Sequence, residues 1–246
     1  MIVFRDLFKS FGSNQVLRGI NITVNEGETL FIIGSSGTGK SVTIKHLVGL
    51  LKADSGEIWL DGEEITHYDE RQFMHVRKKC SMVFQAPALF DSLSVGENVA
   101  FPLRRHTRLS EKEIRDRVIE TLSLVNLSMY ADAMPHEISG SMAKRVSLAR
   151  SIALRPKYVL YDEPTTGADP ITANTLNALI KDFARKLKVT SIVVSHDMES
   201  VRQVADRVIM LYKGKVQFDG SPQALFSSAD PIVRQFVTGV AEGPME

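Results

Sequence analysis

The chain contains, at residues 34–41, the segment Gly34-Ser35-Ser36-Gly37-Thr38-Gly39-Lys40-Ser41. This segment fits the spacing G-x-x-x-x-G-K-[ST]. It follows a short β-rich run at residues 29–33, and helical apolar spacing continues after it through residues 40–50. Glycines at these positions let successive backbone amides turn toward phosphate oxygens, and the helix N-terminus adds partial positive charge. The segment therefore predicts a phosphate-binding loop between a strand and a helix.

A second acidic site follows the apolar run at residues 158–161. Asp162 ends that run, and in proteins with such a loop an aspartate at this place holds Mg²⁺ directly or through water. Glu163 is the next residue and projects to the other side of the chain, where it can polarise a water for attack on a γ-phosphate. In the loop itself, Lys40 reaches the β- and γ-phosphates and Ser41 offers a hydroxyl to Mg²⁺. Together these residues predict nucleotide hydrolysis.

Composition excludes several classes of protein. The 246 residues are 43% hydrophobic and 24% charged, and 30 Lys and Arg against 29 Asp and Glu leave a net charge of +1. Such a balance gives no strong field toward nucleic acid or an anionic membrane. Cys80 is the single cysteine, which excludes a disulfide within the chain, and we expect it to be a small buried hydrophobe. No apolar stretch approaches the ~20 residues that span a bilayer. The first residues do not have the pattern of a secretory signal, so we expect that another subunit would have to place this chain at a membrane.

Strand and helix patterns alternate along the chain. Strands are predicted at residues 1–7, 20–24, 29–33, 57–60, 158–161 and 191–194, with turns at Gly12 and Lys213-Gly214. Residues 86–155 are predicted to be mostly helical, including a helix from the capping box Ser110-Glu111-Lys112-Glu113 to about Val125. Another helix is predicted around residues 171–187. This order indicates an α/β fold with a parallel core sheet and a helical insertion.

Further segments occur in a fixed order around the glycine-rich loop at residues 34–41 and the acidic pair Asp162-Glu163. They are Phe11, Gln85 after the apolar run 82–84, Ile138-Ser139-Gly140-Ser141-Met142, Gly167-Ala168-Asp169 and Ser195-His196-Asp197. With these segments the sequence resembles the ATP-binding-cassette ATPases over nearly its whole length. The resemblance implies a RecA-like P-loop NTPase core with a parallel sheet, an antiparallel β subdomain and an inserted helical subdomain. It places the core and β subdomain at residues 1–85 and 156–222, the helical subdomain at 86–155, and a C-terminal helical tail at 223–246.

The resemblance also implies roles for individual residues, with ATP and Mg²⁺ as cofactors. The implied catalytic residues are Glu163, His196 and Lys40. Glu163 orients or deprotonates the attacking water, and His196 contacts the γ-phosphate. The implied ligands of Mg²⁺ are Ser41, Gln85 and Asp162. The residues expected to bind the nucleotide are Phe11 (stacked on adenine), Gly34, Ser35, Ser36, Gly37, Thr38, Gly39, Lys40, Ser41, Val42, Gln85, Ser139, Gly140, Ser141 and Asp169. The other five histidines have no metal-ligand spacing and are expected on the surface or in loops: His46, His67, His75, His106 and His136.

One position departs from the family pattern. Ser141 stands where most cassettes have glycine. If that position required a positive φ, serine would cost roughly 1–2 kcal/mol. We expect Ser141 to lie in the first helical turn instead, where serine is tolerated.

The resemblance implies partners as well. A second copy of the chain would pack head to tail, so that the Ser139-Gly140 segment serves ATP bound to the opposite subunit. Residues 89–103 are rich in apolar side chains and form either the core of the helical region or the groove for an integral-membrane permease. Details of residues 90–107, 169–172 and the tail at 233–244 resemble the ATPases that power phospholipid transport between the inner and outer membranes of bacteria. The resemblance implies a location at the cytoplasmic face of the inner membrane, a periplasmic lipid-binding subunit as a further partner, and no nucleic acid. The alternatives are the ATPase of an amino-acid-type importer and a soluble cassette of iron–sulfur assembly.

Overall fold

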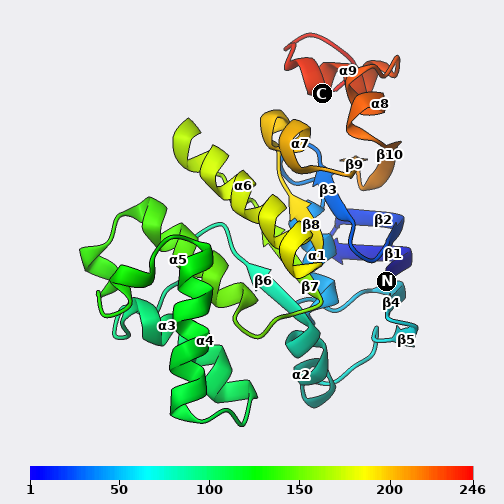
Figure 1. The fold of residues 1–246 in the computed structure, drawn as a ribbon. Coiled ribbons are helices and arrows are strands. Elements are labelled where there is room, and N and C mark those ends of the chain that lie inside the picture. The colour runs from blue at the N-terminus through cyan, green and yellow to red at the C-terminus, as the bar shows by residue number, and fades with distance from the viewer. Residues whose placement is uncertain (246) are drawn as a thin grey trace. The chain divides into compact units, whose positions relative to one another are not determined.

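The computed structural model of the protein describes residues 1–245. The chain forms two compact units, the first made of residues 1–77 with 190–246 and the second of residues 78–189 (Figure 1). The predicted helical subdomain, residues 86–155, falls entirely within the second unit. The predicted division of the core at residues 85 and 156 stays a prediction.

The first unit contains an antiparallel sheet with strand order β2-β1-β4-β5. Gly12, at φ 60°, makes the predicted turn between β1 and β2. β2 begins earlier than predicted, because pairing with β1 carries it through Arg18 and Gly19, which interrupt the apolar pattern. The strands span Ile2–Phe11 (β1), Asn14–Val24 (β2), Ser55–Leu60 (β4) and Glu63–Glu64 (β5).

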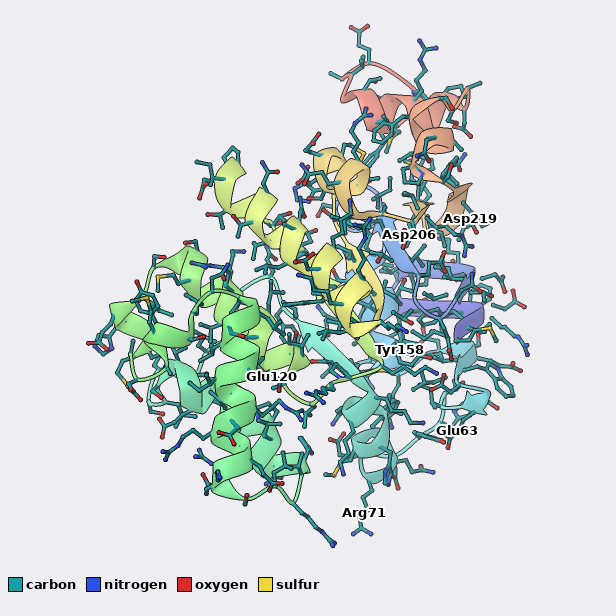
Figure 2. All side chains as sticks on the ribbon, in the orientation of Figure 1. Glu63, Arg71, Glu120, Tyr158, Asp206 and Asp219 are labelled. Atoms are coloured by element: carbon teal, nitrogen blue, oxygen red, sulfur yellow. The ribbon has the colours of Figure 1, made fainter. Side chains whose placement is uncertain are left out.

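A second group of strands in the first unit has the order β10-β9-β3-β8. β3 (Thr29–Ile33) pairs in parallel with both β8 (Thr190–Val194) and β9 (Arg207–Tyr212). All residues of β3 and β8 are buried, as is typical of parallel strands covered on both faces. β10 (Lys215–Gly220) returns antiparallel to β9 through the predicted turn at Lys213-Gly214. Arg207 pairs with Asp219 across this hairpin, and the amide of Thr29 donates to Asp206; both acids are labelled in Figure 2.

The first unit contains five helices among the residues that the structure describes, and some of them differ from the sequence prediction. α1 follows β3 and ends at Leu47 rather than residue 50, and Gly49 (φ 70°) stands just beyond it in the conformation that commonly ends helices. α2 and α7 were not predicted. In α2 only Phe73 and Val76 are buried, so its apolar stripe is too narrow to show in a charged segment. The helices span Lys40–Leu47 (α1), Glu70–Lys79 (α2, whose last turn contains the unit boundary), Met198–Val204 (α7), Pro222–Phe226 (α8) and Pro231–Thr238 (α9).

The second unit contains two parallel strands and a group of helices. β6 (Cys80–Val83) pairs with β7 (Tyr158–Asp162), and Cys80 is buried as expected. α3, α4 and α5 pack against one another (Figure 1). The predicted capping box is confirmed at the start of α4, where the hydroxyl of Ser110 accepts from the amide of Glu113 and the Glu113 carboxylate accepts from the amide of Ser110. The helices span Val95–His106 (α3), Glu111–Leu124 (α4), Gly140–Ile152 (α5) and Pro170–Leu187 (α6), with short 3₁₀ turns at Ser128–Tyr130 and Pro135–Glu137.

No helix among residues 1–245 is a candidate membrane span. None of their helices combines the length and apolar character that crossing a bilayer requires.

Candidate functional site

The glycine-rich loop joins β3 to α1, as predicted, and its path depends on glycine. Gly34 has φ 145° and Gly39 has φ 100°. A Cβ on Gly34 would lie 2.4 Å from the carbonyl oxygen of Leu211, and one on Gly39 would lie 2.4 Å from a methyl carbon of Leu17. Side chains at these two positions are excluded, so the backbone itself forms the wall of the loop.

Lys40 lies at the start of α1 with its ammonium group held inside the loop. Its Nζ donates to the carbonyl oxygens of Gly34 and Ser35, at 2.9 and 3.0 Å, and only 5% of the residue is exposed. No side chain caps the N-terminus of α1, where Gly39 is the capping residue. The amides of the first turn and the Lys40 cation therefore suit a phosphate group, whose charge the helix N-terminus also favours.

His196 leaves the sheet at the same edge as this loop. β3 and β8 run parallel with Ile32 opposite Val194, so residues that follow the two strands emerge on one side. His196 is exposed there. The next residue, Asp197, caps α7 by accepting hydrogen bonds from the amide of Glu199 and the hydroxyl of Ser200, at 2.9 and 2.6 Å. The cap fixes the backbone on one side of His196, whose side chain is exposed.

Phe11 ends β1 beside the Gly12 turn. Its ring is 48% exposed, and the ammonium group of Lys9 lies 5.5 Å from the ring centroid. An exposed aromatic face beside a cation suits stacking with a planar base.

In the second unit, Gln85 and the Asp162-Glu163 pair emerge together. β6 and β7 are parallel with Val83 opposite Tyr161, so the residues after both strands lie at the same sheet edge. Asp162 is buried at the end of β7. The three side chains that were predicted to act on Mg²⁺ and water from this unit thus share one edge.

Glu163 adopts a backbone conformation that is rare for residues with a side chain, with φ 50°. Such strain persists only where surrounding contacts enforce it, and it concentrates at functional sites. The hydroxyl of Thr166 donates to Oε2 of Glu163 at 2.9 Å, and the amide of Thr166 donates to the Glu163 carbonyl at 3.2 Å. A tight turn therefore orients this carboxylate, and Thr166 is a residue that the sequence analysis missed because a lone threonine carries no motif.

Ser139 caps α5, the helix that begins within the segment at residues 138–142. Its hydroxyl accepts from the amide of Met142 at 3.2 Å and lies 3.0 Å from the hydroxyl of Ser141. Ser141 is the second residue of α5 and is absent from the residues with positive φ. The expected position of Ser141 in the first helical turn is confirmed, and that serine is tolerated there stays a prediction.

Replacing Ser141 with glycine should therefore change ATP turnover by less than about threefold. Glycine removes one hydroxyl and costs roughly 0.5–1 kcal/mol of helix stability, while the backbone amide stays in place. Steady-state ATPase assays of the two proteins measure the ratio. A hundredfold gain in the glycine variant would show that serine impairs the natural site.

Asp169 caps α6, and both of its carboxylate oxygens accept hydrogen bonds in that cap. Its Oδ1 accepts from the amides of Ile171 and Thr172, both at 3.0 Å, and its Oδ2 accepts from the Thr172 hydroxyl at 2.6 Å. These hydrogen bonds, the Thr172 hydroxyl first, lower the pKa of Asp169. The carboxylate thus fixes the first turn of α6.

His46 does not lie on the surface or in a loop, so that expectation is wrong. It sits on the inner side of α1 and is 1% exposed. Its Nδ1 lies 2.6 Å from the carbonyl oxygen of Val42 and donates to it, which leaves Nε2 buried without a hydrogen bond. Burial lowers the pKa of His46, and the Lys9 charge adds to that effect, against opposing contributions from the carbonyls of Val42 and Lys52 and from Asp54.

The free energy of unfolding should consequently fall when the pH drops below 6.5, the ordinary histidine value. The unfolded chain accepts the proton first, so the stability that His46 contributes is present above its unfolded pKa and lost as the pH falls through the lower folded one. Each unit of lowering corresponds to about 1.4 kcal/mol. Urea unfolding at pH 7.5 and 5.5 measures the loss, which should shrink in His46→Leu and persist in a control at the exposed His75, His75→Gln. Equal losses in the wild-type protein and His46→Leu would contradict the assignment.

Metal-binding clusters of three or more His, Cys, Asp or Glu residues do not occur within residues 1–245. The predicted Mg²⁺ ligands are instead one hydroxyl, one amide and one carboxylate, from Ser41, Gln85 and Asp162. Oxygen donors of this kind suit Mg²⁺, which keeps several waters and binds few protein groups. Ser41 belongs to the first unit, whereas Gln85 and Asp162 belong to the second, and each residue offers an oxygen of the kind that Mg²⁺ binds.

A comparison with protein families now bears on this site. The model of the family described as "ABC transporter" matches residues 17–166. This chain belongs to the ABC transporter family. Membership makes it an ATPase, as the glycine-rich loop and the acidic pair predicted, and confirms the recognition of a cassette in the sequence.

Curated relatives of this ABC ATPase match its whole length. The intermembrane phospholipid transport system ATP-binding protein MlaF of Escherichia coli K12 is 41% identical over 245 residues, which is 100% of this chain and 91% of MlaF. MlaF of Haemophilus influenzae is also 41% identical and is covered to 93%. The probable ribonucleotide transport ATP-binding protein mkl of Mycobacterium tuberculosis H37Rv is 40% identical over 239 residues, 97% of this chain and 67% of mkl.

Solved cassettes share the fold of this ABC ATPase. The dimeric post-hydrolysis structure of the cassette MJ0796, bound to ADP and Pi, has a TM-score of 0.82 at 30% identity and covers 90% of this chain and 99% of that one. The structure of cbiO1 from Clostridium perfringens, part of the ABC transporter complex cbiONQ, has a TM-score of 0.85 at 31% identity, with 92% and 90% covered. The predicted α/β class with parallel and antiparallel sheets and a helical region is confirmed.

Proposed function

We propose that this ABC ATPase powers phospholipid transport between the inner and outer membranes of a bacterium, from the cytoplasmic face of the inner membrane. The observation that carries the proposal is the 41% identity to MlaF over the full chain, at 91–93% of the relative's length. The mkl protein is 40% identical to this chain, but the match covers only 67% of the length of mkl. No observation favours the amino-acid importer or the iron–sulfur cassette.

In the proposed reaction, the loop amides and Lys40 bind the β- and γ-phosphates of ATP. Phe11 stacks on the adenine, and the rest of the loop through Val42 lines the phosphates. Ser41, Gln85 and Asp162 would hold Mg²⁺, which supplies charge neutralisation on the phosphate oxygens when bound. Glu163 accepts the proton of the attacking water or orients it, and the geometry of its turn keeps the carboxylate in one position. His196 contacts the γ-phosphate.

The functional assembly is proposed to be a dimer of two copies with ATP between them. The dimeric MJ0796 cassette supports this arrangement for a chain of the same fold. Ser139 and Gly140, at the N-terminus of α5, would then face ATP held by the Lys40 loop of the other copy, because a capped helix N-terminus with outward-facing amides suits phosphate. ATP binding would favour the closed dimer, and hydrolysis would release it.

A groove in the second unit is proposed to receive a cytoplasmic helix of the permease. It has a volume of about 440 Å³, and its lining includes Phe84, Phe90, Phe101, Pro102 and Leu154. Phe90 and Phe101 are 43% and 44% exposed and lie with ring centroids 4.7 Å apart. Val95, Val99 and Leu103 of the same stretch are buried in the helical core. The apolar segment predicted at residues 89–103 thus divides between core packing and an exposed aromatic surface, and that surface supports the proposed docking of the permease.

Affinity purification from native membranes in mild detergent, with mass spectrometry of proteins and lipids, tests this function. We expect a permease, a periplasmic lipid-binding subunit and bound phospholipid. Phe101→Asp should lose the permease, whereas Ile119→Asp, on α4 outside the groove and 43% exposed, should retain it. Recovery of a bound ribonucleotide, or of a solute-binding protein, without phospholipid would overturn the proposal. Recovery of soluble partner proteins alone would overturn it as well.

A further inference from the structure

Lys144, in the second turn of α5, donates hydrogen bonds to three backbone carbonyls from two separate segments. Its Nζ lies 3.3 Å from the carbonyl oxygen of Gln85, 3.1 Å from that of Pro164 and 3.0 Å from that of Thr166. A lysine ammonium has three donors, so these three contacts use all of them. No carboxylate within residues 1–245 forms an ion pair with Lys144, so main-chain oxygens alone hold this cation.

The three acceptors belong to the segments that carry two of the proposed active-site residues. Gln85 itself supplies one carbonyl, at the start of the loop that leaves β6. Pro164 and Thr166 supply the others and lie in the strained turn that begins at Glu163. Because the hydroxyl of Thr166 donates to the Glu163 carboxylate at 2.9 Å, the Lys144 ammonium is linked to that carboxylate through a single residue.

The side chain of Lys144 is half-buried. Its side chain lines a small cavity together with Phe84, Leu148 and Leu176. Burial lowers the pKa of Lys144 below its usual range. A hydrogen bond from a cation is about twice as strong as a neutral one, and the bonds to Pro164 and Thr166 are partly shielded from water.

A second cation on α5 holds the next part of the Gln85 loop. Arg150 donates to the carbonyl oxygens of Pro87 and Ala88, at 3.0 and 2.8 Å. The loop therefore stays attached to α5 when Lys144 is replaced. Replacement releases only the Gln85 end of the loop and the turn at residues 163–166.

We propose that Lys144 is a positioning residue for hydrolysis: it fixes Gln85 and the Glu163 turn relative to each other and to the helix that begins at Ser139. The proposal rests on the roles proposed above for Glu163 and Gln85. Since α5 presents the Ser139-Gly140 amides at its N-terminus, the same lysine ties those amides to both catalytic segments. A displacement of α5 stretches bonds to both segments together.

Steady-state kinetics of Lys144→Met, Lys144→Arg and Arg145→Met test this role. Methionine keeps an unbranched apolar stem and removes every donor. We expect kcat for ATP hydrolysis to fall about 10- to 100-fold in Lys144→Met, since misplacement by about 1 Å costs that much, while the ATP concentration for half-saturation changes less than threefold. Arginine restores donors to the carbonyls and should recover most of kcat.

Arg145→Met is the matched control. Arg145 is the next residue on α5 and donates to the carbonyl oxygen of Val125, at 3.0 Å, outside the catalytic segments. We expect it to lower the melting temperature as much as Lys144→Met does but to keep kcat within threefold. A normal kcat in Lys144→Met would overturn the proposal, and so would equal kcat losses in the two methionine variants or no recovery in a folded Lys144→Arg.

Glu163→Gln, assayed beside these variants, separates the failure of this inference from that of the site assignment. If Glu163→Gln abolishes turnover and Lys144→Met does not, Lys144 is not a positioning residue and the assignment stands. If Glu163→Gln hydrolyses ATP normally, the assignment itself is wrong, and the positioning role falls with it.

Discussion

Glu163→Gln should lower kcat for ATP hydrolysis by about 10²- to 10⁴-fold, the range that loss of a general base produces. The amide has nearly the shape of the carboxylate but cannot accept a proton from water. Oε2 of Glu163 accepts from the Thr166 hydroxyl, and an amide oxygen can accept the same bond. The strained turn at φ 50° should therefore survive the substitution, so the loss reports chemistry and not misfolding.

The same variant should bind ATP and accumulate as a dimer, because a nucleotide that is not hydrolysed continues to bridge the two copies. Size-exclusion chromatography with light scattering, with and without saturating ATP, measures the dimer. Glu120→Gln is the control, since Glu120 is exposed on α4 and pairs with Arg155 (Figure 2). Turnover within tenfold of the wild-type protein, or a Glu163→Gln monomer at saturating ATP, would contradict the proposed site.

Gly34→Ala should destabilise the protein by about 2–5 kcal/mol and abolish ATP binding. Two costs add at this position. The backbone has φ 145°, which favours glycine, and the added Cβ would lie 2.4 Å from the carbonyl oxygen of Leu211 and 2.8 Å from the Thr38 hydroxyl. A main-chain carbonyl in β9 cannot rotate away, so the loop itself must shift, and with it the amides that face phosphate.

Gly12→Ala separates the two costs. Gly12 also has positive φ, at 60°, but a Cβ there meets no atom within 4 Å. It should lose only about 1–2 kcal/mol and bind ATP normally. Urea unfolding and nucleotide titration of both variants measure the difference, and equal stabilities for the two would show that the approach to Leu211 is not rigid.

Patterns within short stretches of sequence predicted the parts of this fold that local chemistry determines. The glycine-rich loop, the buried strands β3, β7 and β8, and the capping box at Ser110 each depend on neighbours a few residues away, and each was found where expected. Ser141 was also placed correctly, because helix N-termini have a recognisable order of residues.

Features that depend on distant parts of the chain were not predictable. α2 is held by two buried side chains in a charged segment, and one of them, Phe73, packs on Gly49 of the loop after α1. His46 was misplaced because nothing nearby in sequence indicates that its side of α1 is buried. Lys144 was missed because its three acceptors lie 20 to 59 residues away, and no motif joins a lysine to carbonyls at such separations.

ATP hydrolysis by this chain is proposed to move phospholipid. The chain, purified with its membrane partners and reconstituted in proteoliposomes, can be assayed for ATP-dependent transfer of a fluorescent phospholipid, with the Glu163→Gln complex as the inactive control. We predict transfer that requires ATP and is lost in that variant. ATP-dependent movement of a radiolabelled ribonucleotide or amino acid, with no movement of phospholipid, would contradict the account.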